Sequence, residues 1–87
     1  MTKESILAIV KEELMDILED VEEEQITMDK SMKDLGANSL DIVEVVSTSM
    51  RKLKVKVPRS KLNDLKNIGE LVDVLHQEVE AKAAASA

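Results

Sequence analysis

The chain has 87 residues, a length that gives one compact core and one domain. It has no Phe, Tyr, Trp or Cys, so aliphatic side chains must form the core, and disulfides, thiolate metal sites and cysteine nucleophiles are excluded. The formal charge is −6, and the excess acids lie in residues 1–34. This asymmetry argues against nucleic-acid binding. It fits either an ordinary solvated face or a protein that approaches basic surfaces on its partners.

The first predicted helix covers roughly residues 3–20. Thr2 is a candidate N-cap for it. The apolar residues that follow have the spacing of one helical face, and they are Ile6, Ile9, Val10, Leu14, Ile17, Leu18 and Val21. The longest apolar run, 6–10, is far shorter than a membrane span, and the charges around it do not fit a signal peptide. A cytoplasmic protein without a membrane partner is therefore expected.

Residues 22–38 lose the helical period and form a long polar loop, which is a common place for function. Ile26, Met32 and Leu35 are expected to anchor this loop on the bundle. The acidic run 22–24 lacks the glycine and the alternating oxygen ligands of a calcium loop, so no metal site is expected.

The second predicted helix starts at about Ser39. Gly36 allows a turn, and Asn38 with Asp41 three residues later is typical of a helix N-cap followed by an acid in the first turn. The stretch 42–46 is rich in β-branched residues, which locally favour a strand, but the longer helical period predicts a helix. The apolar positions assigned to this helix are Leu40, Val43, Val46, Met50 and Leu53.

Residues 54–57 alternate like a strand but have no partner strand, so they are predicted to be an extended loop that leads to Pro58. Leu62 and Leu65 fit a helix of one or two turns. Asn67 and Glu70 repeat the cap signal and open a last helix. Its expected packing residues are Ile68, Leu71, Val72, Leu75 and Val79. The segment 81–87 is nearly all alanine and is predicted to be a disordered tail.

These elements predict an all-α fold, an irregular four-helix bundle of three longer helices and one short helix, with a long loop between the first two helices. The domain spans residues 1–80. The residues expected to be buried together are Ile6, Val10, Leu14, Ile17, Val43, Val46, Ile68, Leu71 and Leu75.

Catalytic groupings are largely absent from the sequence. The single histidine, His76, has no second ligand nearby, no phosphate-binding glycine loop is present, and no serine has an evident base. We therefore expect a protein that is not an enzyme, with His76 facing solvent. Ser39 has two interpretations: it is a serine of a capping region, or it bears a phosphodiester that the backbone N–H groups and the helix dipole stabilise.

The segment 36–41, Gly-Ala-Asn-Ser-Leu-Asp, resembles the Gly-x-Asp-Ser-Leu attachment motif of acyl carrier proteins. The likeness covers residues 3–80, because the approach 26–36, the Val57-Pro58 loop and the segment 67–71 also resemble family features. It implies an acyl-carrier-like bundle. It also implies that a phosphopantetheinyl transferase attaches 4'-phosphopantetheine from coenzyme A to Ser39, and that the thiol of this arm holds an acyl group.

The resemblance places the main partner surface on the second helix. By position, Asp41 and Glu44 match acidic residues that meet basic patches on partner enzymes. The sequence departs from the family where Asn38 replaces the usual Asp and where Met50 and Arg51 replace late acids. The full set of expected partner-binding residues is Asn38, Leu40, Asp41, Glu44, Met50 and Arg51.

The runs 35–39 and 66–75 resemble the free-standing donor carriers of polyketide β-branching cassettes. Those carriers hold an acetyl group for a synthase related to hydroxymethylglutaryl-CoA synthase. The implied partners are that synthase and an acyltransferase or ketosynthase-like decarboxylase, with the carrier itself a monomer. The alternatives are a generic type II fatty-acid or polyketide carrier and, from another class, an unmodified helical interaction module.

The stretch 51–61 contains six Lys and Arg residues and no acid. These charges either balance the acidic first helix within the bundle or change the surface that partners recognise.

Overall fold

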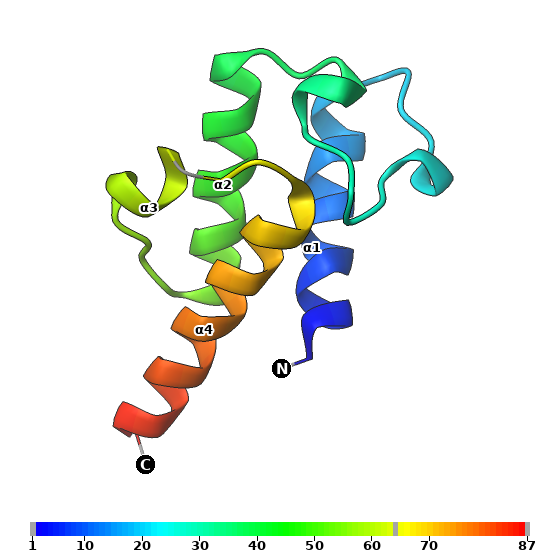
Figure 1. The fold of residues 1–87 in the computed structure, drawn as a ribbon. Coiled ribbons are helices and arrows are strands. Elements are labelled where there is room, and N and C mark those ends of the chain that lie inside the picture. Colours follow the sequence, from blue (N-terminus) through cyan, green and yellow to red (C-terminus); the bar gives the residue numbers. More distant parts are fainter. Residues whose placement is uncertain (1, 64, 87) are drawn as a thin grey trace.

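A computed structural model describes residues 2–63 and 65–86 of the chain. All regular structure among these residues is helical (Figure 1). The helices are α1 (Lys3–Ile17), α2 (Ser39–Leu53), α3 (Arg59–Asn63) and α4 (Ile68–Ser86), with two short 3-10 turns, η1 (Glu23–Gln25) and η2 (Lys33–Leu35), between α1 and α2. The predicted all-α fold of three longer helices and one short helix is confirmed.

Helix α1 packs against both α2 and α4, and Figure 1 shows α3 on the other side of α2. The side chains between these helices form one apolar core that includes residues of the connecting loops. Its fully or almost fully buried members are Ile6, Val10, Leu14, Ile26, Val45, Val46, Leu53, Val55, Val57, Ile68, Leu71, Val72 and Leu75.

Side chains cap the starts of the three longer helices where the sequence predicted. Thr2 Oγ1 accepts the N–H of Ser5 at 3.1 Å, and Asn67 Oδ1 accepts the N–H of Glu70 at 2.8 Å. Helix α1 ends at Ile17 instead of residue 20, because Leu18 takes an extended backbone conformation. Leu18 therefore packs on the core from the start of the loop.

The buried face of α2 differs from the prediction. Val43 was expected in the core but is 58% exposed, and Leu40 is 80% exposed. Val46 and Leu53 are buried as predicted, and Val45 and Ser49 complete the buried face in place of Leu40 and Val43. Both sets have helical spacing, and packing against α1 selects the second. Ile17, also expected in the core, is only partly buried at the end of α1.

The long loop between α1 and α2 lies against the start of α4. Ile26 is buried, and the other two predicted anchors of the loop, Met32 and Leu35, are partly buried against the core. The N–H of Ile68 donates to the carbonyl of Lys30, and the N–H of Gly69 donates to that of Met28, both at 2.8 Å. A Cβ at Gly69 would lie only 3.0 Å from the Met28 carbonyl oxygen, so glycine permits this close approach.

The segment 54–58 connects α2 to α3 as an extended loop, as predicted, with Val55 and Val57 buried. Helix α3 begins directly after Pro58. It includes Leu62, whereas Leu65 lies between α3 and α4.

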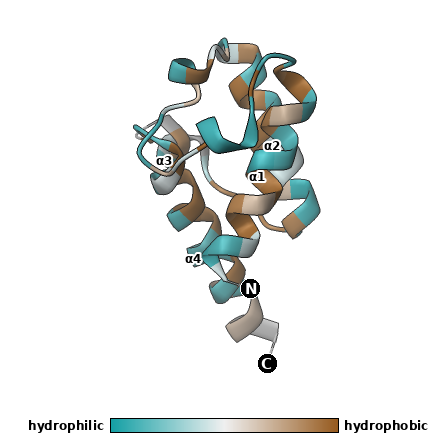
Figure 2. Cartoon of the chain, turned by 90° about the vertical axis from the view of Figure 1, so that its right-hand side faces the viewer, coloured by the Kyte–Doolittle hydropathy of each residue, from teal (hydrophilic) through white to brown (hydrophobic). Residues whose placement is uncertain are grey.

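The alanine-rich segment was expected to be disordered, but α4 continues through it to Ser86. Alanine has the highest helix propensity, so these residues extend a helix that is already formed. Figures 1 and 2 show this end of α4 projecting beyond the bundle. Within the described ranges, no helix is both long enough and apolar enough to cross a membrane.

Candidate functional site

The turn at Gly36 sets the direction in which the chain enters α2. Gly36 has a left-handed backbone with φ of 98°. Its N–H donates to the Lys33 carbonyl at 3.0 Å, and the N–H of Ala37 donates to the Met32 carbonyl at 3.0 Å. This pair of bonds is a Schellman motif. It ends η2 and directs the next residues towards the first turn of α2.

The start of α2 is held by a reciprocal pair of bonds between Asn38 and Asp41. Asn38 Oδ1 accepts the N–H of Asp41 at 2.8 Å, and Asp41 Oδ2 accepts the N–H of Asn38 at 3.2 Å. Ser39 is then the first helical residue and is exposed. The free N–H groups of a first helical turn and the helix dipole give this position a positive potential. The site therefore combines an accessible hydroxyl with surroundings that favour an anion.

Two further acids fix the loop that precedes the site. Asp34 Oδ2 accepts the N–H of Ser31 at 3.1 Å, and the Ser31 hydroxyl accepts the N–H of Asp34 at 3.0 Å. The bond from the Ser31 N–H lowers the pKa of Asp34. The hydroxyl of Thr27 donates to Asp29 at 2.5 Å and lowers the pKa of Asp29. Both carboxylates are thus ionised at neutral pH and order the approach to Ser39.

Three of the predicted partner residues lie together on the outer face of α2. Leu40, Glu44 and Arg51 are all exposed, and their spacing of four and seven residues puts them on one side of the helix. We call these three residues the outer face. Val43, which sequence reasoning assigned to the core, is exposed beside them. The other predicted partner residues lie elsewhere: Asn38 and Asp41 form the cap described above.

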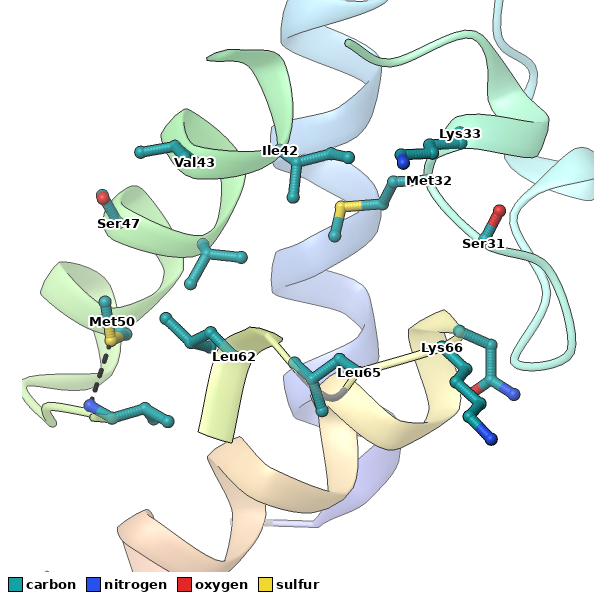
Figure 3. Close-up of a pocket in the computed structure, with 13 residues that line it drawn as sticks. Ser31, Met32, Lys33, Ile42, Val43, Ser47, Met50, Leu62, Leu65 and Lys66 are labelled. Atoms are coloured by element: carbon teal, nitrogen blue, oxygen red, sulfur yellow. Dashed lines mark hydrogen bonds between the residues drawn. The ribbon is translucent and has the colours of Figure 1, made fainter. Parts of the chain in front are cut away.

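Met50 is turned away from the outer face, towards a cavity of about 850 Å³ beside α2 (Figure 3). It is partly buried, and its Sδ accepts the N–H of Val57 at 3.2 Å. No pattern in the sequence predicted this contact, because it joins a helical side chain to a loop N–H seven residues later.

Two lysines of the basic stretch form ion pairs within the bundle. Lys52 Nζ lies 2.5 Å from Glu13 Oε1 and 3.6 Å from Glu12 Oε1, and Lys61 Nζ lies 3.6 Å from Glu78 Oε1. The hydrogen bond to Glu13, whose side chain is nearly buried, raises the pKa of Lys52. Charge balance therefore accounts for these two lysines. Arg51 has no carboxylate at ion-pair distance among the described residues and is available to a partner.

His76 was expected to face solvent. Its side chain is about one quarter exposed, and Nε2 lies 3.4 Å from Glu80 Oε1, one turn further along α4. It lies on α4, apart from the residues around Ser39.

Comparisons with known proteins show the family to which the chain belongs. Residues 4–75 match the family described as "Phosphopantetheine attachment site". The acyl carrier protein of Exiguobacterium sibiricum is 38% identical over 80 residues, which are 91% of this chain and 100% of that protein. The chain belongs to the acyl carrier proteins. The "Polyketide biosynthesis acyl-carrier-protein AcpK" of Bacillus subtilis is 30% identical to this carrier over 81 residues, 93% of this chain and 99% of that protein.

A solved structure is also similar to this carrier. It is the crystal structure of the curacin biosynthetic pathway HMG synthase in complex with acetyl donor-ACP. The matching chain has a TM-score of 0.76 and 35% sequence identity, and the match covers 85% of this carrier and 95% of that chain.

The cofactor of this carrier is 4'-phosphopantetheine, held covalently. The residues at the start of α2 fit such a group, because Ser39 is exposed and the first turn of α2 favours the negative charge of a phosphodiester. The alternative of an unmodified interaction module is therefore set aside.

Proposed function

We propose that Ser39 is the attachment site and that the carrier donates an acetyl group to an HMG-synthase-like enzyme in polyketide β-branching. The likeness to the chain solved with the curacin HMG synthase carries this proposal, because it combines a TM-score of 0.76 with 35% identity. The polyketide relative from Bacillus subtilis supports the same pathway class.

The residues around Ser39 have distinct roles in this proposal. The bonds between Asn38 and Asp41 keep the first turn of α2 formed, so that the Ser39 hydroxyl stays exposed. The N–H groups of that turn stabilise the phosphodiester. When bound, the arm supplies the thiol that holds the acyl group as a thioester. The carrier presents this group and performs no catalysis itself.

The outer face is the proposed docking surface. Leu40 offers an apolar contact close to Ser39, Glu44 offers an acid one turn away, and Arg51 adds a base near the end of α2. A partner must match this order of charges. An enzyme whose docking surface is basic along the whole length of α2 would meet Arg51 with a like charge, and this repulsion disfavours its binding. The partners are a phosphopantetheinyl transferase, the synthase, and an acyltransferase or ketosynthase-like decarboxylase that provides the acetyl group.

Intact-mass measurement tests the attachment site. Incubation with coenzyme A and a phosphopantetheinyl transferase should add one arm to the parent protein and none to Ser39→Ala. The matched control is Ser47→Ala, two turns further along α2, which should load like the parent. Stability should fall by at most about 1 kcal/mol in Ser39→Ala, because Asn38 is the capping residue. An arm on the Ser39→Ala protein would contradict the assignment.

Acetyl transfer to a β-branching synthase tests the pathway. The acetyl-loaded parent should acetylate the synthase, and Arg51→Glu should weaken its binding at moderate salt without affecting loading. The single substitution is preferred to a joint change of Met50 and Arg51, because Met50 also holds the loop at Val57. Exposed Lys30 provides the control Lys30→Glu, with the same charge change away from α2.

The 38% identical acyl carrier protein favours a second candidate, a generic type II carrier. A generic carrier would deliver its acyl group to a fatty-acid ketosynthase at least as fast as to the β-branching synthase. That rate order would contradict the donor proposal while leaving the attachment site intact.

A further inference from the structure

The cavity beside α2 is lined along this helix from Ile42 to Met50, and Val57 of the following loop also lines it. Its α2 wall includes Ile42, which is three residues after Ser39, and Val46. Leu62 and Leu65 line it from the opposite side (Figure 3). Ile42 and Met50 are eight residues apart, which is about 12 Å along a helix. An acyl group that enters from the Ser39 end would therefore pass along apolar walls towards Met50.

Met50 holds the loop that lines the cavity at Val57. Its backbone carbonyl accepts the N–H of Val55 at 3.0 Å, and its Sδ accepts the N–H of Val57 at 3.2 Å. Val55 and Val57 are both buried in the core. A thioether is a weak acceptor, yet a buried N–H without a partner is unfavourable. The Met50 thioether therefore couples the cavity to the position of the loop between α2 and α3.

We propose that Met50 is a specificity-determining residue that limits this carrier to short acyl groups. A long acyl chain that reaches Met50 must displace the thioether and leave the Val57 N–H unpaired in apolar surroundings. A short acyl group, such as the proposed acetyl cargo, never reaches Met50 and leaves the bond intact. This inference rests on the proposed attachment at Ser39. It adds that a residue of α2 sets the length of the acyl group that the carrier accepts.

The Val57 amide reports directly on this contact. The full chain is loaded on Ser39 with arms bearing acetyl, butanoyl, hexanoyl, octanoyl or decanoyl groups, and amide shifts, hydrogen exchange and melting temperature are measured. Acetyl and butanoyl should leave the Val57 amide as in the arm-only protein. Decanoyl should shift its signal and accelerate its exchange by about tenfold or more, the size expected for loss of one buried bond.

Two variants separate the thioether from its volume. Met50→Leu keeps a side chain of similar size but removes the acceptor, so Val57 exchange should be fast with every cargo and the length dependence should disappear. Met50→Ala should also remove the length dependence, and it should lengthen the cavity. Loading with decanoyl should therefore change the melting temperature of the Met50→Ala protein more favourably than that of the parent. Met15→Leu makes the same change at an exposed methionine of α1 and should behave as the parent.

The outcomes are distinguishable from those of the proposed function. A Val57 amide in the parent that ignores cargo length, or a Met50→Leu protein that retains the parent's length dependence, overturns this inference. A protein that gains no arm overturns the attachment at Ser39 and this inference with it. Normal length dependence together with failure to acetylate the synthase overturns only the β-branching proposal.

Discussion

The first turn of α2 is held by bonds that reach three residues along the chain, whereas its last turns are held by groups distant in sequence. At the start, Asn38 and Asp41 bond each other. Near the end, Lys52 pairs with Glu13 of α1, and Lys82 of α4 donates to the Lys54 carbonyl. The start of α2 should therefore persist when tertiary contacts weaken, while its end depends on the whole bundle. Ser39, the proposed attachment site, lies at the locally determined end.

The core that both ends share should show the largest effect. Leu71→Ala removes a fully buried side chain of α4 and should lower the free energy of unfolding by about 2–5 kcal/mol. Urea denaturation measures it, with the partly buried Val79→Ala as a milder control. A loss below about 0.5 kcal/mol would be typical of a surface position and would contradict the packing of α4.

Breaking the pair near the end of α2 should have the next largest effect. Lys52→Met leaves the Glu13 carboxylate, on a side chain only 8% exposed, without its cation and should lower the melting temperature. Adding Glu13→Gln should recover part of the loss, which a double-mutant cycle measures. If Glu13→Gln lowers the free energy of unfolding of the Lys52→Met protein as much as it lowers that of the parent, the pair contributes nothing to stability.

The same pair gives a pH dependence. Because the folded pKa of Lys52 is raised above its ordinary value of 10.5, the stabilisation is fully present below about pH 10.5 and is lost as pH rises through the folded pKa. The parent should lose more stability than Lys52→Met in this alkaline range, as measured by thermal melts at matched ionic strength. Equal losses would contradict the raised pKa.

Changes at the first turn of α2 should have a smaller effect on the free energy of unfolding, and their effect on amide exchange should stay within that turn. Asn38→Ala removes the cap and should cost about 1 kcal/mol, with faster amide exchange in the first turn of α2. The Val57 amide should keep its protection from exchange when the variant and the parent are compared under conditions that give them the same free energy of unfolding. Asn38→Asp retains a capping oxygen and should stay close to the parent. Equal loss of protection at both ends would remove the distinction between them.

The smallest expected effect has the opposite sign. Lys54, which ends α2, has a left-handed backbone with φ of 57°, a conformation that costs a side-chain-bearing residue free energy. Lys54→Gly should raise the free energy of unfolding by about 0.5–1 kcal/mol after the added freedom of the unfolded chain is subtracted. Gly36→Ala is the reverse control, since φ is 98° there, and should destabilise.

The division between local and distant contacts also explains what the sequence could predict. The caps at Thr2, Asn38 and Asn67 depend on residues within one turn, and all three form. The position of Ser39 at the start of α2 follows from the second cap. The loop anchors Ile26, Met32 and Leu35 were also recognisable, because they are isolated apolar residues in a polar segment.

The sequence predicted Val46 and Leu53 on the buried face of α2, but it could not decide between Val43 and Val45. Ile42, Val43, Val45 and Val46 are apolar on both sides of Glu44, so two helical stripes fit equally well. The correct stripe includes Ser49, which is fully buried and whose Oγ has no hydrogen-bond partner in the described structure. A polar residue in the core hid the correct phase. The Met50 contact was hidden for a related reason, because a sulfur acceptor has no sequence signature.

The arrangement of the helices has a practical consequence for experiments on this carrier. Figure 1 shows the start of α1 and the end of α4 at one end of the bundle and the start of α2 at the other. An affinity tag, a fluorophore or a surface linkage joined through either terminus would thus lie far from Ser39. Immobilised carrier should bind its partners with the same affinity whichever terminus is tethered.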